Sequence, residues 1–222
     1  MAAVIRAENS IMALHTLLRP VLVGCANSRY VADPQISGRE RLRRAMNIEL
    51  GSCTEIMNLV GRASGDQLSK YDERRRKIAS GGRALGFAVV NPEIKKTKHV
   101  WAPWHLGQPP PTEMRLVETL LESSEVPRIG LTLYRLLSAA VHAQPHTLQM
   151  FIHRESAVPS GIGHSQVPIR MSESNLATLL LVAVSAATLA VDSCVALFDW
   201  PADPWRVNVV PFFRHLQTLV DD

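Results

Sequence analysis

The stretch that decides the fold is residues 176–198, which read LATLLLVAVSAATLAVDSCVALF. Its 23 residues contain a single charged side chain, Asp192. The length meets the criterion for a membrane-spanning helix. However, Ala, Ser and Thr are frequent, no group of Lys or Arg flanks the stretch, and acidic residues lie at both ends. We therefore expect the central helix of a soluble bundle and no contact with a membrane.

The remainder of the chain has the same helical character. Apolar residues recur every three or four positions in residues 3–31, and Pro20 predicts a kink there. Ser37 and Glu40 have the spacing of a capping box and open a predicted helix that ends at about Val60. Further helices are expected at residues 66–84, 112–123, 127–143, 145–153, 172–198 and 203–220. The pattern predicts an all-α, single-domain helical bundle of six to eight helices.

Two stretches interrupt the helical pattern within this one domain of residues 1–222. Residues 88–111 form a Pro-rich strap with Trp101 and Trp104, and residues 157–171 form a loop rich in Gly and Pro. A long irregular segment in a compact domain is often a lid or a binding loop. The alternative is an ordered strap that the tryptophans pack onto the bundle, and both interpretations stay open from the sequence.

Composition excludes few functions. The 24 Lys and Arg residues exceed the 20 Asp and Glu residues by four, which permits contact with phosphate but does not indicate a dedicated nucleic-acid binder. The three cysteines, Cys25, Cys53 and Cys194, are too far apart for a disulfide framework or a paired-cysteine metal site. Arg6 interrupts the apolar run that a signal peptide needs, so we expect a cytoplasmic protein. We expect neither a metal nor a cofactor.

The most distinctive polar pattern is YRLLSAAVH, residues 134–142. On a helix, Arg128, Arg135, Ser138 and His142 fall within about 80° of one another, and apolar residues fill the opposite side. This stripe is either a functional site or the face of a helix that meets water.

Arg135, six further residues and His142 resemble the signature of HEPN-domain proteins. The resemblance implies a helical homodimer that brings two such pairs together as a metal-independent ribonuclease. Arg135 would hold the scissile phosphate and His142 would move a proton to or from the ribose 2′-hydroxyl or the leaving oxygen. Ser138 completes the candidate catalytic set, and Arg128 is a candidate substrate-binding residue. The residue after the arginine is usually polar in active members, whereas it is Leu136 here.

A wider resemblance covers most of the chain. The segments LLRP, SGRERLRRAM, PPPTEMRLVETLL and LYRLLSAAVH occur in an order similar to that of a group of uncharacterised actinobacterial helical proteins. This resemblance implies a fold and no activity. Those relatives have a glutamate four residues after the first-helix arginine, whereas Arg19 is followed at that distance by Val23.

Two other functions stay open from the sequence. The first is a helical bundle that binds or converts an apolar small molecule, with both loops as lids and with Trp101, Trp104, Asp192 and His142 as its lining. The second is a partner-binding scaffold without chemistry. Asp192 helps to decide between these two functions. An acid in so apolar a helix either lines a pocket or is paired with an arginine such as Arg19 or Arg135.

Two basic clusters, RERLRR at residues 39–44 and RRRK at residues 74–77, allow a further interpretation. They would line a groove for a nucleic-acid backbone if their helices are adjacent, with Tyr71 stacking on a base. The alternative is a solvated surface. His142, His146 and His153 have metal-like spacing, but Pro145 separates the first two, so we expect no metal site.

Overall fold

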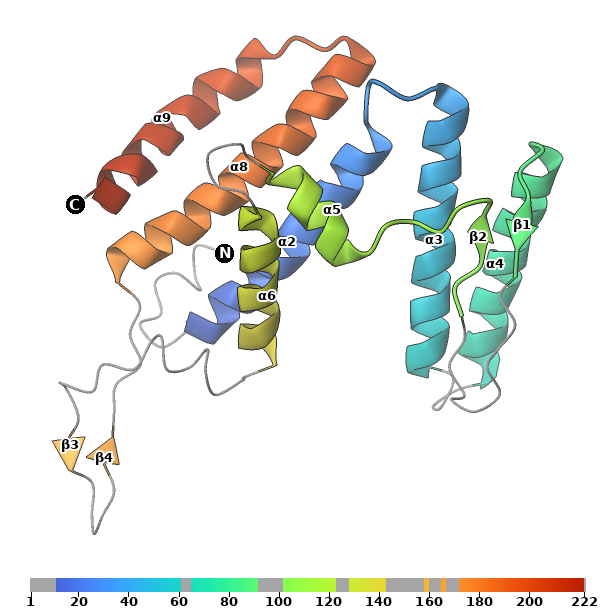
Figure 1. The fold of residues 1–222 in the computed structure, drawn as a ribbon, viewed down its shortest axis with the longest axis horizontal. Coiled ribbons are helices and arrows are strands. Elements are labelled where there is room, and N and C mark those ends of the chain that lie inside the picture. The colour runs from blue at the N-terminus through green and yellow to red at the C-terminus, as the bar shows by residue number, and fades with distance from the viewer. Residues whose placement is uncertain are drawn as a thin grey trace. The chain divides into compact units, whose positions relative to one another are not determined.

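The protein is all-α. The computed structural model describes residues 11–60, 65–91, 102–122, 128–142, 158–159, 165–166 and 172–221. These residues form seven helices and two short antiparallel ladders (Figure 1). The predicted fold class and the predicted six to eight helices are confirmed, and the helix expected at residues 145–153 lies outside the described residues.

The element bounds agree closely with the sequence pattern. The helices are α2 (Ile11–Val31), α3 (Gly38–Val60), α4 (Gly65–Ala84), α5 (Glu113–Leu120), α6 (Ile129–Val141), α8 (Glu173–Phe198) and α9 (Asp203–Asp221). The strands are β1 (Val89–Val90), β2 (His105–Leu106), β3 (Val158–Pro159) and β4 (Ser165–Gln166), and β1 pairs with β2 and β3 with β4. The two stretches predicted to be irregular therefore each contain a short ladder.

The elements fall into two compact units. One unit consists of Met1–Arg29 and Glu113–Asp222, and the other is Tyr30–Thr112. The first holds most of α2 together with α5, α6, α8 and α9, and the second holds α3, α4 and the β1–β2 ladder. The prediction that all 222 residues make a single domain stays a prediction.

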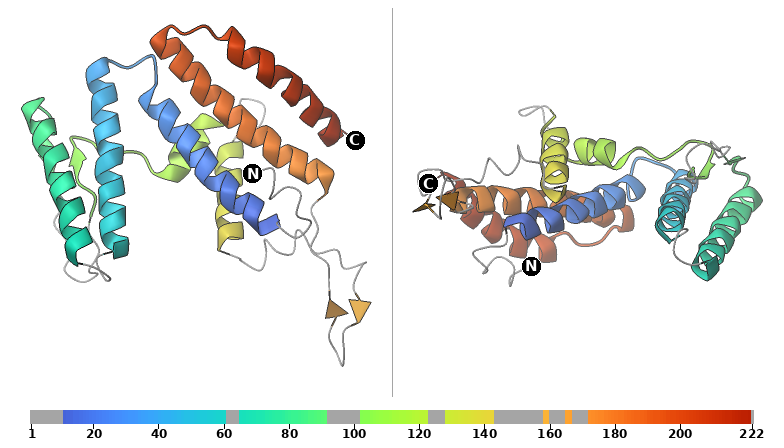
Figure 2. Two further views of the ribbon diagram at one scale, coloured as in Figure 1. Left: turned by 180° about the vertical axis from the view of Figure 1, so that it is seen from behind. Right: turned by 90° about the horizontal axis from the view of Figure 1, so that it is seen from below.

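In the first unit, α8 lies between α2 and α9 (Figures 1 and 2). The helix begins as expected, since the Ser172 side chain accepts a hydrogen bond from the Asn175 backbone N–H at 3.1 Å and so caps the first turn. Alanines dominate its buried face, and α2 contributes leucines at every fourth position. The buried residues of these two helices include Leu14, Leu18, Leu22, Ala26, Ala177, Leu179, Ala183, Ala186 and Ala190.

Helix α8 is the one helix of the described residues that is long and apolar enough to cross a membrane, judged by length and composition alone. Of the most apolar 18-residue stretch of this helix, 22% is buried. Helix α9 covers part of α8 with Val209 and Leu216, which are 9% and 3% exposed. The expected absence of membrane contact stays a prediction.

The start of α6 packs directly against the backbone of α5. Gly130 is buried, and a Cβ atom built on it would lie 2.5 Å from the Val117 carbonyl oxygen and 2.8 Å from the Glu118 Cα. These atoms belong to a helix backbone and cannot move as a side-chain tip would. Glycine is therefore required at this position, and it fixes how closely α5 and α6 approach.

Replacing Gly130 with alanine should destabilise the protein by roughly 1–3 kcal/mol, because the added methyl group overpacks a contact with backbone. The matched control is Gly24→Ala in α2, where an added Cβ meets nothing within 4 Å in the described part of the chain. That change should stabilise the helix by about 0.5–1 kcal/mol. Urea unfolding followed by circular dichroism measures both, and equal effects of the two changes would contradict the close α5–α6 contact.

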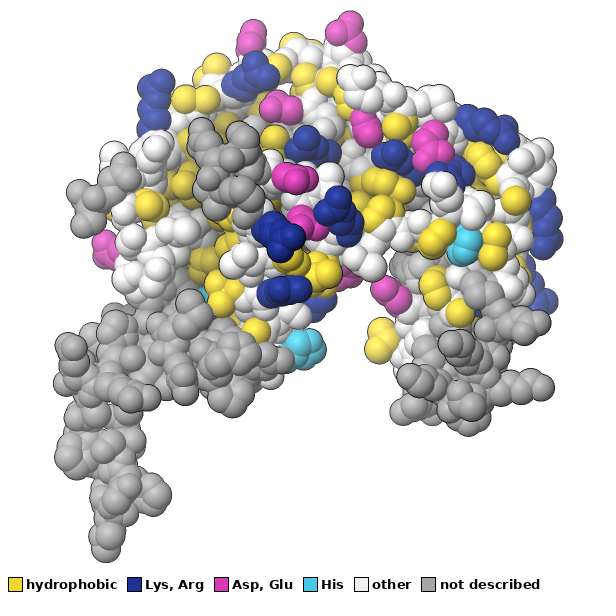
Figure 3. Space-filling view, in the orientation of Figure 1, with side chains coloured by type: hydrophobic (Ala, Val, Ile, Leu, Met, Phe, Trp, Pro, Cys, Tyr) yellow, Lys and Arg dark blue, Asp and Glu magenta, His cyan; other side chains and the backbone are white. Residues whose placement is uncertain are grey.

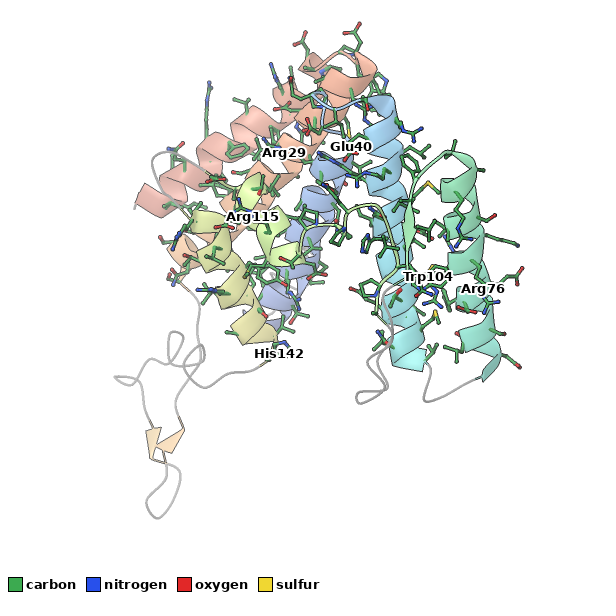
Figure 4. All side chains as sticks on the ribbon, turned by 45° about the vertical axis from the view of Figure 1, so that its right-hand side comes forward. Arg29, Glu40, Arg76, Trp104, Arg115 and His142 are labelled. Carbon is green, nitrogen blue, oxygen red and sulfur yellow. The ribbon has the colours of Figure 1, made fainter. Side chains whose placement is uncertain are left out.

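In the second unit, α3 and α4 form a helical hairpin that the strap covers. Leu106 of β2 is fully buried, and its side chain fills the space left by Gly82 of α4, where a Cβ would lie 2.7 Å from a Leu106 methyl carbon. The Trp104 ring stacks on the guanidinium of Arg75 at 4.3 Å, and Figure 4 shows this side chain near α3 and α4. The described half of the strap is therefore an ordered cover of the hairpin, as the second interpretation of these residues predicts.

A buried amide holds the strap in register. Asn47 of α3 is 2% exposed; its Oδ1 accepts from the Leu106 backbone N–H at 2.7 Å, and its Nδ2 donates to the Gln108 carbonyl at 2.9 Å. The side chain thus supplies both hydrogen bonds that a neighbouring strand would provide. Without it, two backbone groups of the strap would be left unpaired.

The RERLRR cluster also bonds to the backbone of its own unit. Arg43 and Arg39 donate to the carbonyls of Leu106 and Gly86, each at 3.2 Å. Other arginines of the cluster close the turn before α3: Arg41 donates to the carbonyls of Asp33 and Ile36, and Arg44 to that of Tyr30.

Ser37 caps the start of α3 as the sequence predicts, whereas the predicted return bond from the Glu40 side chain to Ser37 is absent among the described residues. The Glu40 N–H donates to the Ser37 hydroxyl at 3.2 Å. The Glu40 carboxylate accepts hydrogen bonds from Arg43 and Arg44, and the bond from Arg43 is the main reason that the pKa of Glu40 is lowered.

Replacing Asn47 with leucine should cost about 2–4 kcal/mol of stability, because it leaves one buried N–H and one buried carbonyl of the strap unpaired. Hydrogen exchange gives a local measure: the Leu106 amide should lose its protection while amides in the middle of α8 keep theirs. Ser52→Ala, at an exposed position of the same helix, is the control and should change neither quantity. Unchanged protection of Leu106 in the leucine variant would contradict the role of Asn47.

Candidate functional site

Helix α6 has one buried face and one cationic face. Gly130, Leu137, Ala139 and Ala140 are buried, and Leu137 is only 1% exposed. The side opposite Leu137 carries Arg128, Arg135 and His142, all exposed, with the half-buried Ser138 and the buried Ala139 beside them. The predicted stripe is therefore present, and Arg135 faces solvent.

The three cations of α6 follow a regular spacing. Arg135 lies within α6 and the other two flank it, Arg128 at the N-cap and His142 at the C-cap, each seven residues from Arg135. Seven residues correspond to about 10.5 Å along the axis of an ideal helix. His142 is the residue at the C-terminal end of α6, and Figure 4 shows its side chain pointing away from the helix end. A row of this kind presents positive charge along one line.

No acid lies on α6, since Ile129–Val141 contains neither Asp nor Glu. Among the described residues, no hydrogen bond or ion pair is made by the side chains of Arg135 and His142. Figure 3 shows Lys, Arg, Asp and Glu side chains together over α5 and α6. The acids of α5 have other partners: Glu113 pairs with Arg19 at 3.1 Å and Glu118 with Arg115 at 2.7 Å.

Arg128 adopts an unusual backbone conformation. It precedes the first residue of α6 with φ 63° and ψ 18°, which is the left-handed region. Glycine reaches this region without strain, whereas an arginine pays roughly 1 kcal/mol for it. The conformation starts the helix so that Gly130 meets α5 and the Arg128 side chain remains exposed.

A cluster of three polar side chains joins α2, α5 and α6. Nη2 of Arg19 donates to Oε2 of Glu113 and to the Tyr134 hydroxyl, each at 3.1 Å, and that hydroxyl donates to the same Glu113 oxygen at 3.0 Å. The guanidinium also lies 5.3 Å from the centre of the Tyr134 ring. The hydrogen bond to Tyr134 is the largest cause of a raised pKa at Arg19, and the charge of Glu113 contributes to it.

A second arginine of α2 completes the attachment of α5. Nη1 of Arg29 donates to the Leu120 carbonyl at 3.2 Å, at the C-terminal end of α5, where backbone carbonyls lack partners within the helix. Glu113 is the first residue of α5, where a negative charge is favourable. The two arginines therefore hold both ends of this eight-residue helix, and α6 is attached through Tyr134.

The other predicted site residues have different roles. Asp192 forms an ion pair with Arg206 of α9 at 3.7 Å, so the predicted pairing with an arginine is confirmed, but the partners proposed for it, Arg19 and Arg135, were wrong. A neighbour in the next helix is the nearer cation. Trp104 belongs to the second unit, where it packs on Arg75, and Trp101 lies outside the described residues.

The RRRK cluster consists of paired side chains. Arg74 pairs with Glu49, Arg76 with Asp72 and Lys77 with Glu73, which favours the interpretation as a solvated surface. Within the part of the chain that the structure describes, no three His, Cys, Asp or Glu side chains gather as a metal site. Burial raises the pKa of the Cys25 and Cys53 thiols, which disfavours the reactive thiolate.

The sequence did not reveal the cluster of Arg19, Glu113 and Tyr134. These residues are separated by 94 and 115 positions from Arg19, and no short motif contains them. The position four residues after Arg19, where the resemblance implies a glutamate, is occupied by Val23. The structure shows instead that Glu113 provides the carboxylate.

Comparisons with known proteins supply no further constraint. No family model matches the chain, and no significant match was found among curated proteins or among solved structures. The function is therefore argued from the residues themselves.

Replacing Tyr134 with phenylalanine tests the three-residue cluster. The change removes the hydroxyl that binds both Arg19 and Glu113 but keeps the ring, so stability should fall by about 1–2 kcal/mol. Glu113→Gln retains an acceptor for Arg19 and should cost less. Thr132→Val, at an exposed position of α6, is the control. If unfolding curves of the tyrosine variant and the wild type coincide, the cluster does not stabilise this unit.

Proposed function

We propose that the protein binds and cleaves RNA without a metal ion, through Arg135 and His142 of α6. The observation that supports this proposal is the exposed row of Arg128, Arg135 and His142 on a helix without acids. Exposed cations that have no partner among the described residues are available for phosphate groups. The resemblance to HEPN-domain proteins assigns the chemistry to the same pair.

The proposed reaction is a transesterification within the RNA. The ribose 2′-oxygen attacks the adjacent phosphorus, the bond to the 5′-oxygen breaks, and the products are a 2′,3′-cyclic phosphate and a 5′-hydroxyl. Arg135 neutralises the phosphate as charge develops on its oxygens, and the half-buried Ser138 donates a hydrogen bond to it. Arg128, about 10.5 Å from Arg135 along the axis, binds a neighbouring phosphate.

The reaction needs one group to accept the 2′-hydroxyl proton and one to give a proton to the leaving oxygen. Imidazole is suited to both steps near neutral pH. Among the described residues, His142 is the one histidine on α6. Two copies of the chain would supply two imidazoles, and for this reason the proposal includes a homodimer.

The alternative of a protein that binds an apolar small molecule stays a prediction. Trp104 and Asp192, two of its expected lining residues, contact Arg75 and Arg206 respectively. The alternative of a partner-binding scaffold has more support, because α9 exposes several apolar side chains.

The decisive experiment incubates a mixed RNA pool with the wild type, Arg135→Ala and His142→Ala in the presence of a chelator. We expect cleavage by the wild type and a loss of about 100-fold or more in each variant, as for removal of a charge-stabilising or proton-transferring group. Arg83→Ala, an exposed arginine of α4 in the second unit, is the control and should cleave as the wild type does.

The products provide a second readout. Fragments ending in a 2′,3′-cyclic phosphate would agree with the proposed attack by the 2′-oxygen. Absence of cleavage by the wild type, or cleavage that survives both α6 substitutions, would overturn the proposal.

A further inference from the structure

Helix α9 has an apolar side that packs and a second side that is exposed. Val209 and Leu216 are buried toward α8. On the exposed side, Val207 is 70% and Val210 40% exposed, and Asp203 and Arg214 are exposed as well. The two valines thus lie between an exposed acid and an exposed base on this side of α9.

Asp203, Val207, Val210 and Arg214 form one stripe among the exposed residues of α9. Their positions, 203, 207, 210 and 214, are separated by four, three and four residues, which on an ideal helix places them within about 60°. Pro211 lies inside α9 between Val210 and Arg214. The buried Val209 and Leu216 lie on the opposite side by the same geometry. Figure 3 shows apolar side chains between charged ones along α9.

The stripe is complementary to itself when reversed. Read in one direction it is acid, valine, valine, base, and read in the other it is base, valine, valine, acid. If two copies of α9 lie antiparallel about a two-fold axis midway between Val207 and Val210, each Asp203 faces an Arg214. Each Val207 then faces a Val210. A two-fold interface requires this kind of self-complementary patch.

We propose that two copies of this chain associate through the stripe of Asp203, Val207, Val210 and Arg214. The occupant of the surface is a second copy because charge and apolar contact both match in one register. Among the described residues, Asp203 and Arg214 make no ion pair within the chain, so both charges are available. Phe198 and Trp200 stack at 4.8 Å just before α9 and are also largely exposed, at 56% and 58%.

The association is weak because the stripe is short. A contact made by one exposed stripe per copy falls below the size of a standard stable interface, so we expect a dissociation constant in the micromolar range. The inference does not depend on the proposed RNA chemistry. The stripe is on α9, the candidate nuclease residues are on α6, and each is tested by its own variants.

The test measures the molar mass of the full chain by sedimentation velocity over a range of protein concentration. The wild type should show a monomer–dimer equilibrium. Asp203→Arg and Arg214→Asp each turn two attractive contacts into two repulsive ones, and each should weaken association at least about tenfold.

Mixing the two charge variants provides the register-specific test. In a mixed dimer the arginines of one chain face the aspartates of the other, so an equimolar mixture should associate although neither variant does so alone. The double variant, Asp203→Arg with Arg214→Asp, should associate as the wild type does. High salt should weaken each of these dimers.

Two further variants test whether association depends on this stripe or responds to any charge added to the surface. Val207→Glu should give a monomer with an unchanged helical circular dichroism spectrum, since this side chain is exposed in a single copy. Leu59→Glu, at the 78% exposed Leu59 of the second unit, should leave association unchanged. A wild type that stays monomeric at 100 μM, roughly the upper end for a contact of this size, would overturn the proposal. A dimer that is insensitive to the α9 charge changes, or a mixture that fails to associate, would overturn it as well.

Discussion

The structure depends on one requirement: each buried backbone group outside the helices needs a hydrogen-bond partner, and here helical side chains supply it. A strand of two residues leaves backbone N–H and carbonyl groups along its free edge without strand partners. Asn47 binds such groups of the strap on both sides of its turn. Arg43 binds a third group of the same segment. Leu106 can be fully buried beside Gly82 only because its N–H and carbonyl are paired in this way.

The same requirement explains why basic clusters are a poor guide to nucleic-acid binding in this chain. An arginine carries five donors in a fixed planar arrangement, which suits carbonyl oxygens at helix ends and turns as well as it suits phosphate. Arg29 and most of the RERLRR cluster donate hydrogen bonds to backbone carbonyls, and side chains of the RRRK cluster form ion pairs with acids. The net charge of +4 thus says little about the surface. The cations that could indicate nucleic-acid binding are those with no hydrogen bond or ion pair among the described residues. Only the contacts in the structure distinguish them from the other cations.

Sequence patterns predicted the helices well because helix formation is local. Ser37 caps the helix that its spacing with Glu40 indicated, and the bounds of α3 and α4 differ from expectation by about one residue. The polar contacts were not predictable from the sequence. Asp192 has several arginines at plausible distances in sequence, and it pairs with Arg206 because the turn between α8 and α9 brings the two helices together. The short pattern of Arg135 and His142 has the same weakness, since about two matches to it arise by chance in a chain with eight histidines.

The direction in which the exposed cations of α6 are held depends on how the opposite face of the helix packs. Gly130 allows α6 to touch the α5 backbone, and Tyr134 links the middle of α6 to Arg19. Both contacts lie on elements that α2 fixes, so the direction of α6 is set by groups away from its exposed row. Any ligand that binds along Arg128 and Arg135 then meets side chains on a helix whose direction is already determined. A helix held in this way loses little conformational entropy on binding, which is the condition under which a few exposed charges can select a ligand.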